Sequence, residues 1–213
     1  ELFSVSSQHY AFVVNAFVSL LKRADMTRYE LFLRETRTYE IIEDVKNFRS
    51  EIGVLFLNSY NRDVLTKMFD DNRLTYTSLF KARPHIFVSK SNPLAKHEVV
   101  SLEDLEDFPY LSYDQGIHNS FYYSEEILSQ IPHKKSIVVS DRATLFNLLI
   151  GLDGYTIATG ILNSNLNGDN IVSIPLDIDD EIDIVYLKHE KATLSKMGEK
   201  FLDNLVKEVT FDN

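Results

Sequence analysis

Strand-like and helix-like patterns alternate over the first 57 residues of the chain. Residues 2–6 read as a strand, and apolar side chains then recur at helical spacing over residues 10–21. Two more strands are expected over residues 29–34 and 52–57, separated by a helix with the apolar stripe Ile41, Ile42, Val45 and Phe48. The third strand is almost entirely apolar, which is typical of a strand inside a parallel sheet. The order βαβαβ therefore predicts an α/β fold.

The same alternation continues through the rest of the sequence. Further strands are expected over residues 75–79, 84–89, 110–113, 136–139, 155–158, 171–175 and 182–187. Helices are expected near residues 102–106, 122–129, 141–151 and 194–206, and residues 163–170 are rich in turn formers. Ser101 and Ser140 are each expected to cap the helix that follows, because a serine hydroxyl can accept a hydrogen bond from a first-turn N–H. The final helix is expected to pack back on the first part of the chain.

The size and charge of the chain limit what it can bind. Its 213 residues suffice for one large domain or two lobes. The formal net charge is −10 and no basic arm compensates for it, so any contact with DNA must come from a part outside this sequence. No apolar run approaches the roughly 18 residues of a membrane span. The chain contains no cysteine, which fits a reducing cytosol, and it starts within a strand-like run, so we expect the native N-terminus to lie further upstream.

The sequence carries none of the common catalytic or nucleotide-binding motifs. It has no phosphate-binding loop, dinucleotide fingerprint, paired-histidine zinc motif or nucleophile elbow, and its six histidines are scattered. The acidic cluster at residues 177–183 is interpreted as a solvated charge run, not a metal site. We therefore expect no cofactor, no metal and no catalysis.

One segment resembles a known family. Asn92-Pro93-Leu94-Ala95 forms a turn, and residues 100–111 then read as a capped helix followed by a strand. This arrangement resembles the effector-binding domain of LysR-type transcriptional regulators. Weaker matches in the expected order lie at residues 4–7, 36–42, 51–54 and 149–157. The last of these has an extra residue between Gly151 and Gly154, and Thr159-Gly160 stands where the family often has Leu-Pro.

The resemblance implies an overall organisation. It implies two lobes of mixed, mostly parallel sheet flanked by helices and joined by hinge strands, as in periplasmic binding proteins. Lobe I would comprise residues 1–88 and 172–213, and lobe II residues 89–171. A small, anionic effector would bind in the cleft between the lobes. The protein would be a cytoplasmic homodimer or tetramer, with the helix over residues 10–21 and the second strand meeting the second lobe of a partner. It would bind DNA only through an N-terminal winged helix-turn-helix that this sequence lacks, and it would not bind a membrane.

Polar residues at the ends of predicted strands are the candidate ligand contacts. Ligands of open α/β sheets bind beyond the carboxyl ends of the strands, where helix N-termini favour anions. This rule and the resemblance select Ser6, Ser7, Thr36, Thr38, Ser112, Tyr113, Ser140 and Asp141. Arg37 is added because its guanidinium could pair with a ligand carboxylate. The alternative is that the hydroxyls only cap helices and that Arg37 is solvated or paired with a nearby Glu.

Two other functional classes remain open at this point. A solute-binding protein of a transport system would share the fold but would carry a secretion signal upstream. A two-lobed enzyme of similar fold, such as a dehydratase or deaminase, would turn over its small-molecule ligand. Both differ from the regulator in what surrounds the domain or in what happens to the ligand.

Overall fold

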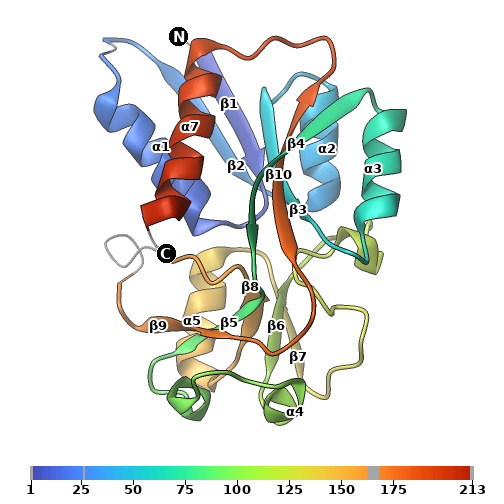
Figure 1. Cartoon of the computed structure of the whole chain (residues 1–213), viewed down its shortest axis with the longest axis vertical. Coiled ribbons are helices and arrows are strands. Elements are labelled where there is room, and N and C mark those ends of the chain that lie inside the picture. Colours follow the sequence, from blue (N-terminus) through green and yellow to red (C-terminus); the bar gives the residue numbers. More distant parts are fainter. Residues whose placement is uncertain (1, 26, 163–167, 212–213) are drawn as a thin grey trace. The chain divides into compact units, whose positions relative to one another are not determined.

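The computed structural model describes residues 2–25, 27–162 and 168–211 of the chain, which divides into two units (Figure 1). Unit 1 comprises residues 1–80 and 183–213, and unit 2 comprises residues 81–182. The divisions expected after residue 88 and before residue 172 fall inside strands β5 (His85–Ser89) and β9 (Ile171–Pro175). These two strands pair with each other within unit 2.

A five-stranded sheet forms the centre of unit 1. Its strands are β1 (Leu2–Ser7), β2 (Glu30–Glu35), β3 (Ile52–Leu57), β4 (Leu74–Ala82) and β10 (Ile182–His189), in the order β2-β1-β3-β10-β4. β1 runs parallel to both β2 and β3, whereas β10 runs antiparallel to β3. Every residue of β3 is buried, as its apolar run predicts. The expected α/β fold, with a mixed sheet, is confirmed.

In the described part of the chain, four helices flank this sheet. α1 (Ala11–Arg23) and α7 (Lys196–Phe211) pack side by side, which confirms that the C-terminal helix returns to the first part of the chain (Figure 1). The rings of Phe3, Phe17 and Phe201 contact one another with centroids 5.5–5.9 Å apart and join β1, α1 and α7. α2 (Thr38–Lys46) and α3 (Arg62–Asp71) complete the set.

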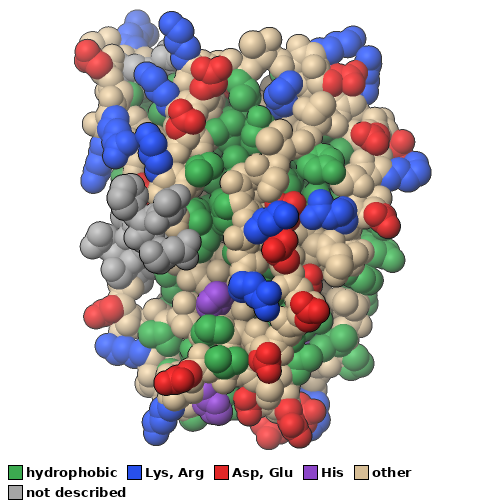
Figure 2. Space-filling model, in the orientation of Figure 1, with side chains coloured by type: hydrophobic (Ala, Val, Ile, Leu, Met, Phe, Trp, Pro, Cys, Tyr) green, Lys and Arg blue, Asp and Glu red, His purple; other side chains and the backbone are tan. Residues whose placement is uncertain are grey.

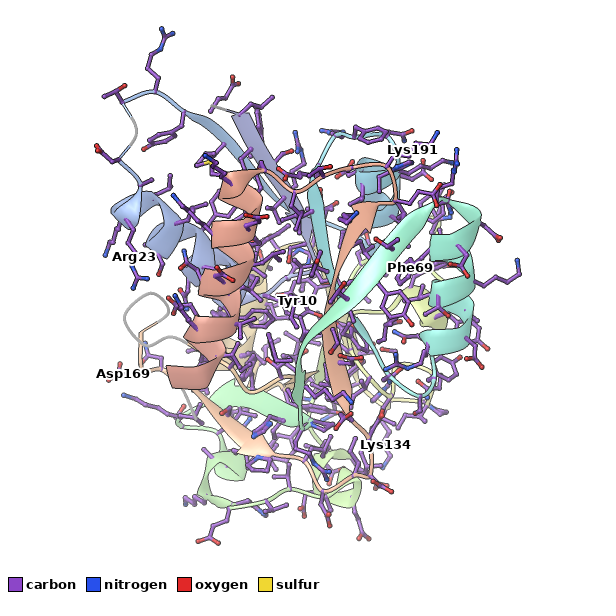
Figure 3. All side chains as sticks on the ribbon, turned by 45° about the horizontal axis from the view of Figure 1, so that its top comes forward. Tyr10, Arg23, Phe69, Lys134, Asp169 and Lys191 are labelled. Carbon is purple, nitrogen blue, oxygen red and sulfur yellow. The ribbon has the colours of Figure 1, made fainter. Side chains whose placement is uncertain are left out.

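The sequence analysis did not predict α3. Only Leu65 and Phe69 of this helix are buried, so its apolar stripe is short. Phe69 lies toward the sheet, with its ring centroid 5.7 Å from that of Tyr76 on β4 (Figure 3). The spacing of these two residues by one helical turn is the signal that could have identified the helix.

The described residues of unit 2 form two small sheets. β5 lies between β8 (Thr156–Ala158) and β9 and is antiparallel to both, and β6 (Tyr110–Tyr113) runs parallel to β7 (Ser136–Val139). A backbone bridge between Tyr110 and Tyr155 connects the sheets. α5 (Arg142–Leu152) covers one face with a buried core of Phe87, Leu111, Val139, Leu145, Leu149 and Ile171.

The segment that carries the family resemblance folds as the sequence predicts. Ser101 caps the short helix α4 (Leu102–Leu105) by accepting a hydrogen bond from the Asp104 backbone N–H at 3.3 Å. The Asp104 carboxylate accepts from the Ser101 N–H at 2.9 Å, which completes a capping box. A 3-10 turn, η1 (Pro93–Lys96), precedes this helix, and the Asn92 side chain accepts from the Leu94 N–H at 2.9 Å.

Asn92 also fixes the turn after α5. Its amide donates to the carbonyl of Asp153 at 3.0 Å and to that of Gly154 at 3.4 Å. Asp153 ends the helix in the left-handed conformation, with a φ of 52°. One buried side chain therefore joins two segments that are about 60 residues apart in the sequence.

Replacing Asn92 with alanine is expected to destabilise unit 2 by about 1–3 kcal/mol, because buried carbonyls and an N–H would lose their partner. The measurement is the free energy of unfolding from a urea titration. Ser91→Ala, at an exposed neighbouring position, is the matched control and is expected to change that free energy by about 0.5 kcal/mol or less. Equal urea midpoints for the two variants would contradict this structural role of Asn92.

Three local predictions were wrong. The expected helix over residues 122–129 is only a 3-10 turn, η2 (Phe121–Tyr123), followed by irregular turns. Here the Glu126 carboxylate accepts a hydrogen bond from the Tyr113 N–H, so a contact with β6 replaces a regular helix.

The other two concern single residues. Phe48 is not part of the buried stripe, since it follows α2 with a φ of 59° and is 62% exposed. Asp141, not Ser140, caps α5 by accepting from the Thr144 N–H at 2.8 Å. The turn-rich stretch at residues 163–167 lies outside the described residues.

Candidate ligand-binding site

Three polar turns lie at one edge of the sheet of unit 1. Because β1, β2 and β3 are parallel, their carboxyl ends meet at the same edge. The turns begin at Gln8, Thr36 and Asn58, and the Thr36 N–H donates to the Ser7 carbonyl at 2.9 Å. The first two turns are among those predicted from the sequence, and the third is not.

Gln8 holds this edge together. Its amide nitrogen donates to the Thr38 hydroxyl at 2.7 Å, and its oxygen accepts from the Tyr10 hydroxyl at 2.7 Å and from the Phe56 N–H at 3.1 Å. The side chain is 1% exposed, so these contacts fix the turns after β1 and β2 against β3. Sequence reasoning did not select Gln8, because a glutamine after a strand carries no distinctive signal.

The two serines at the end of β1 make their hydrogen bonds within unit 1. The Ser6 hydroxyl donates to the Asp44 carboxylate at 2.7 Å and lies 2.7 Å from the Ser50 hydroxyl. The Ser7 hydroxyl donates to the Gln8 carbonyl at 2.7 Å. Both side chains are fully buried. The structure thus places these hydroxyls in a network that stabilises the unit, and their contact with a ligand stays a prediction.

The turn after β2 exposes a cation at a helix start. Arg37 is exposed and occupies the N-cap position of α2, where its side chain makes no capping hydrogen bond. Its carbonyl accepts from the Ile41 N–H at 3.0 Å. Thr36, next to it, is partly exposed, whereas Thr38 is buried against Gln8. Arg37 and Thr36 are therefore the candidate residues of this turn that solvent reaches.

The turn after β3 is fixed by two asparagines. The Asn61 side chain accepts from the Asn58 N–H at 2.8 Å, and the Asn58 side chain accepts from the Asn61 N–H at 3.0 Å. Ser59 is exposed at the tip of this turn. Its polar sequence directly after an all-apolar strand is the signal that could have added it to the candidates.

The second group of candidates lies at one edge of unit 2. β6 and β7 are parallel, with Tyr113 opposite Val139, and the Asp114 N–H donates to the Val139 carbonyl at 2.8 Å. This register brings the chain after Tyr113 next to Ser140 and Asp141, which are both exposed. The Asp141 carboxylate accepts from the N–H and the hydroxyl of Thr144, both at 2.8 Å.

A hollow of about 400 Å³ lies against the same strand pair. Side chains alternate across a strand, so Leu111 and Val139 face the core with α5, whereas Tyr110, Ser112, Ser136 and Val138 line the hollow. The segment over residues 113–133 supplies the remaining lining. Ser112 and Tyr113 are the sequence-predicted candidates that border this space.

Glu126 is the buried charged residue of that lining. Its side chain is 4% exposed, and one carboxylate oxygen accepts from the Tyr113 N–H at 3.1 Å. Burial raises the pKa of the Glu126 carboxyl well above its ordinary value, and the charge of the neighbouring Glu125 adds to this effect. Sequence reasoning missed Glu126, because Glu125-Glu126 resembles any acidic pair on a surface.

No metal centre is evident in the described residues. Among them, no group of three or more His, Asp or Glu side chains is arranged to hold a metal ion. No helix in the described part of the chain has the length and apolarity needed to cross a membrane.

Open α/β sheets that end in polar turns are typical of small-molecule-binding proteins. The sequence of the chain matches the family model described as the LysR substrate binding domain over residues 10–210, and the chain belongs to this family. It is the ligand-sensing domain of a LysR-type transcriptional regulator, and the family assignment decides against a transport receptor.

Solved structures of LysR-type regulators share the fold. The effector-binding domain of QuiR, in complex with shikimate, is 16% identical over 97% of this chain and 96% of that chain, with a TM-score of 0.63. The reduced regulatory domain of OxyR from Pseudomonas aeruginosa is 12% identical over 97% and 98% of the two chains, with a TM-score of 0.67. HinK from the same organism is 13% identical over 98% of this chain and 70% of its own, with a TM-score of 0.62. Among curated proteins, none matches the chain. The expected periplasmic-binding-protein-like fold is confirmed.

Proposed function

We propose that this domain binds a small metabolite that carries a carboxylate and thereby controls transcription without catalysing a reaction. The observation that supports this proposal most directly is the turn after β2. It presents the exposed Arg37 beside Thr36 at the N-terminus of α2. A guanidinium can pair with a carboxylate through two hydrogen bonds, and first-turn amides of a helix also favour an anion.

The other candidate residues would form hydrogen bonds with the remaining polar groups of the ligand. Hydroxyls of Ser112, Tyr113 and Ser140 can donate to or accept from ligand hydroxyls, and Asp141 can accept from a donor. The shikimate bound by the QuiR domain carries hydroxyls as well as a carboxylate. These are the groups that the hydroxyls of unit 2 and Arg37 are proposed to contact. We therefore expect hydroxylated or unsaturated small carboxylates to bind better than phosphate esters or peptides.

The ligand would act by changing the relative populations of two arrangements of the regulator. A ligand shifts a regulator only by binding one of its arrangements more tightly than the other. We propose that the domain works in the cytoplasm as a homodimer or tetramer, and that DNA is bound by a winged helix-turn-helix outside this sequence. The net charge of −10 supports this separation of roles. On the face shown in Figure 2, acidic side chains are interspersed with the basic ones.

Arg37→Ala is expected to weaken binding of a carboxylate effector about tenfold or more, because a charge-assisted hydrogen bond contributes about 1.5–3 kcal/mol. The effector would be found by a thermal-shift screen of small carboxylates and their primary amides, and its Kd would be measured by isothermal titration calorimetry. The amide of the effector is expected to bind wild-type protein at least about tenfold more weakly.

Arg23→Ala is the matched control, since it removes the same charge from an exposed position at the end of α1. An unchanged Kd in Arg37→Ala would overturn the assignment of this turn. Conversion of the effector by purified wild-type protein, followed by NMR, would favour the enzyme alternative over a sensor.

A further inference from the structure

The hollow of unit 2 has the features of a built site. Its volume of about 400 Å³ lies within the range of small-molecule pockets. All of its lining residues lie between residues 110 and 138, so it belongs to unit 2 alone. It is defined by Tyr110, Ser112, Glu126, Ser129, His133 and Ser136, together with the residues around them.

The charge of this lining is one-sided. Glu126 and Asp114 contribute carboxylates, whereas none of the lining residues is Lys or Arg. Glu126 is almost fully buried, and within the described residues it forms no ion pair. Apart from its own backbone, its carboxylate is contacted by one donor, the Tyr113 N–H. A buried carboxyl with so little compensation is costly for the folded state unless something else pairs with it.

The walls around this carboxyl are held rigidly. Ser129 donates from its hydroxyl to the Glu126 carbonyl at 2.7 Å and lies 3.1 Å from the Tyr110 hydroxyl. The His133 ring stacks on the ring of Tyr110 with centroids 3.8 Å apart. One nitrogen of His133 lies 3.3 Å from the Leu128 carbonyl, and the other lies 3.4 Å from the Tyr155 hydroxyl. The rings of Tyr110 and His133 are thus fixed by contacts within unit 2.

We propose that this hollow is a second ligand site, which takes a small organic cation with an ammonium group and pairs it with the Glu126 carboxylate. Ammonium is favoured because the lining contains a buried carboxylate, hydroxyl acceptors and the aromatic residues Tyr110 and Phe121, whose ring type attracts cations. A carboxylate or phosphate would meet like charge with no Lys or Arg in the lining to bind it. The hollow shares Ser112 and Tyr113 with the residues proposed for the effector, but it does not include Arg37 and its lining has the opposite charge.

The test compares a cation with a neutral molecule of the same shape. 2-Phenylethylamine and 2-phenylethanol would be titrated into the wild-type chain and into Glu126→Gln, with Kd values measured by isothermal titration calorimetry. The amine is expected to bind wild-type protein at least about tenfold more tightly than the alcohol, and Glu126→Gln is expected to lose that difference, since it removes a charge-assisted hydrogen bond. Glu125→Gln, which removes the same charge at the adjacent residue, is expected to retain it.

Two results would overturn the proposal. One is equal binding of the amine and the alcohol, or of neither at millimolar concentration, to wild-type protein. The other is an unchanged amine Kd in Glu126→Gln. Failure of this test leaves the Arg37 prediction untouched, because that prediction concerns a carboxylate ligand and the Arg37 side chain, which does not line the hollow.

The pH dependence of binding supplies a second readout. The ammonium pairs with the ionised carboxylate, and burial holds the proton on Glu126 to higher pH than usual. Amine affinity is therefore expected to rise with pH as this proton is lost, with proton release visible as a buffer-dependent heat. Asp114, Glu125, Tyr110 and His133 also face or influence the carboxyl, so the rise must be absent from Glu126→Gln to be assigned to Glu126.

Stability measurements show whether the Glu126→Gln variant is folded. Because the folded chain holds this proton more tightly than the unfolded chain, the unfolding free energy of wild-type protein falls as pH rises from the ordinary carboxyl pKa through the raised one. Glu126→Gln lacks this loss of unfolding free energy, so it is expected to melt at a higher temperature than wild-type protein at neutral pH. At pH 4 the difference between the two melting temperatures is expected to be smaller. A lower melting temperature at neutral pH would contradict the cost assigned to burying the Glu126 carboxylate.

Discussion

Gly154→Val is expected to destabilise unit 2 by about 3 kcal/mol, at the upper end of the cost of overpacking a core. A Cβ atom at Gly154 would lie 2.4 Å from a methyl carbon of Leu111 and 3.2 Å from the Pro109 carbonyl oxygen. Leu111 is fully buried against α5, so it has no open space to move into. The measurement is the protection of unit 2 amides in hydrogen exchange, which should fall while that of unit 1 amides changes little.

Gly151 provides the matched control for this prediction. It lies in the same corner, three residues earlier, but a Cβ atom there would meet nothing within 4 Å. Gly151→Ala places a better helix former inside α5 and is expected to stabilise the unit by about 0.5–1 kcal/mol. Equal protection in the two variants would contradict the close approach of this corner to β6.

Phe201→Ala is expected to destabilise unit 1 by about 3–5 kcal/mol, the usual cost of truncating a buried phenylalanine. Phe201 is fully buried on α7 and contacts the rings of Phe3 and Phe17. Its loss would leave a cavity where three elements meet, and α7 would lose its main attachment to α1 and β1.

The measurement is again hydrogen exchange, with the loss of protection confined to unit 1. Asp203→Ala, at an exposed position on the same helix, is the control and is expected to change the unfolding free energy by about 0.5 kcal/mol or less. If unit 2 lost as much protection as unit 1 in Phe201→Ala, the two units would not unfold independently.

The sequence is sufficient to predict most of the regular elements, because their burial leaves a local pattern. β3 and β9 have the predicted bounds, since one is wholly buried and the other is preceded by turn signals. α3 was missed because it buries only two residues. Residues 122–129 were assigned to a helix because local propensity does not reveal that Glu126 is bound to the end of β6.

The sequence likewise predicts some features of the candidate site and not others. The positions of its turns follow from strand order, because parallel strands end at one edge. Which hydroxyls face solvent does not follow from strand order. Ser6 is bound to Asp44 and Ser50, which are 38 and 44 residues away in the sequence, and Thr38 is bound to Gln8. Such distant pairs leave no trace in the local spacing of residues, and neither does the burial of Glu126.

The order of strands in unit 1 has a consequence for folding during synthesis on the ribosome. β10 lies between β3 and β4, yet it is made about 100 residues after β4. Unit 2 is continuous in the chain and can fold as soon as it emerges, because domains fold as units during synthesis. The sheet of unit 1 cannot be completed until β10 has been synthesised. Residues 1–80 are therefore made first but are expected to reach their native state last.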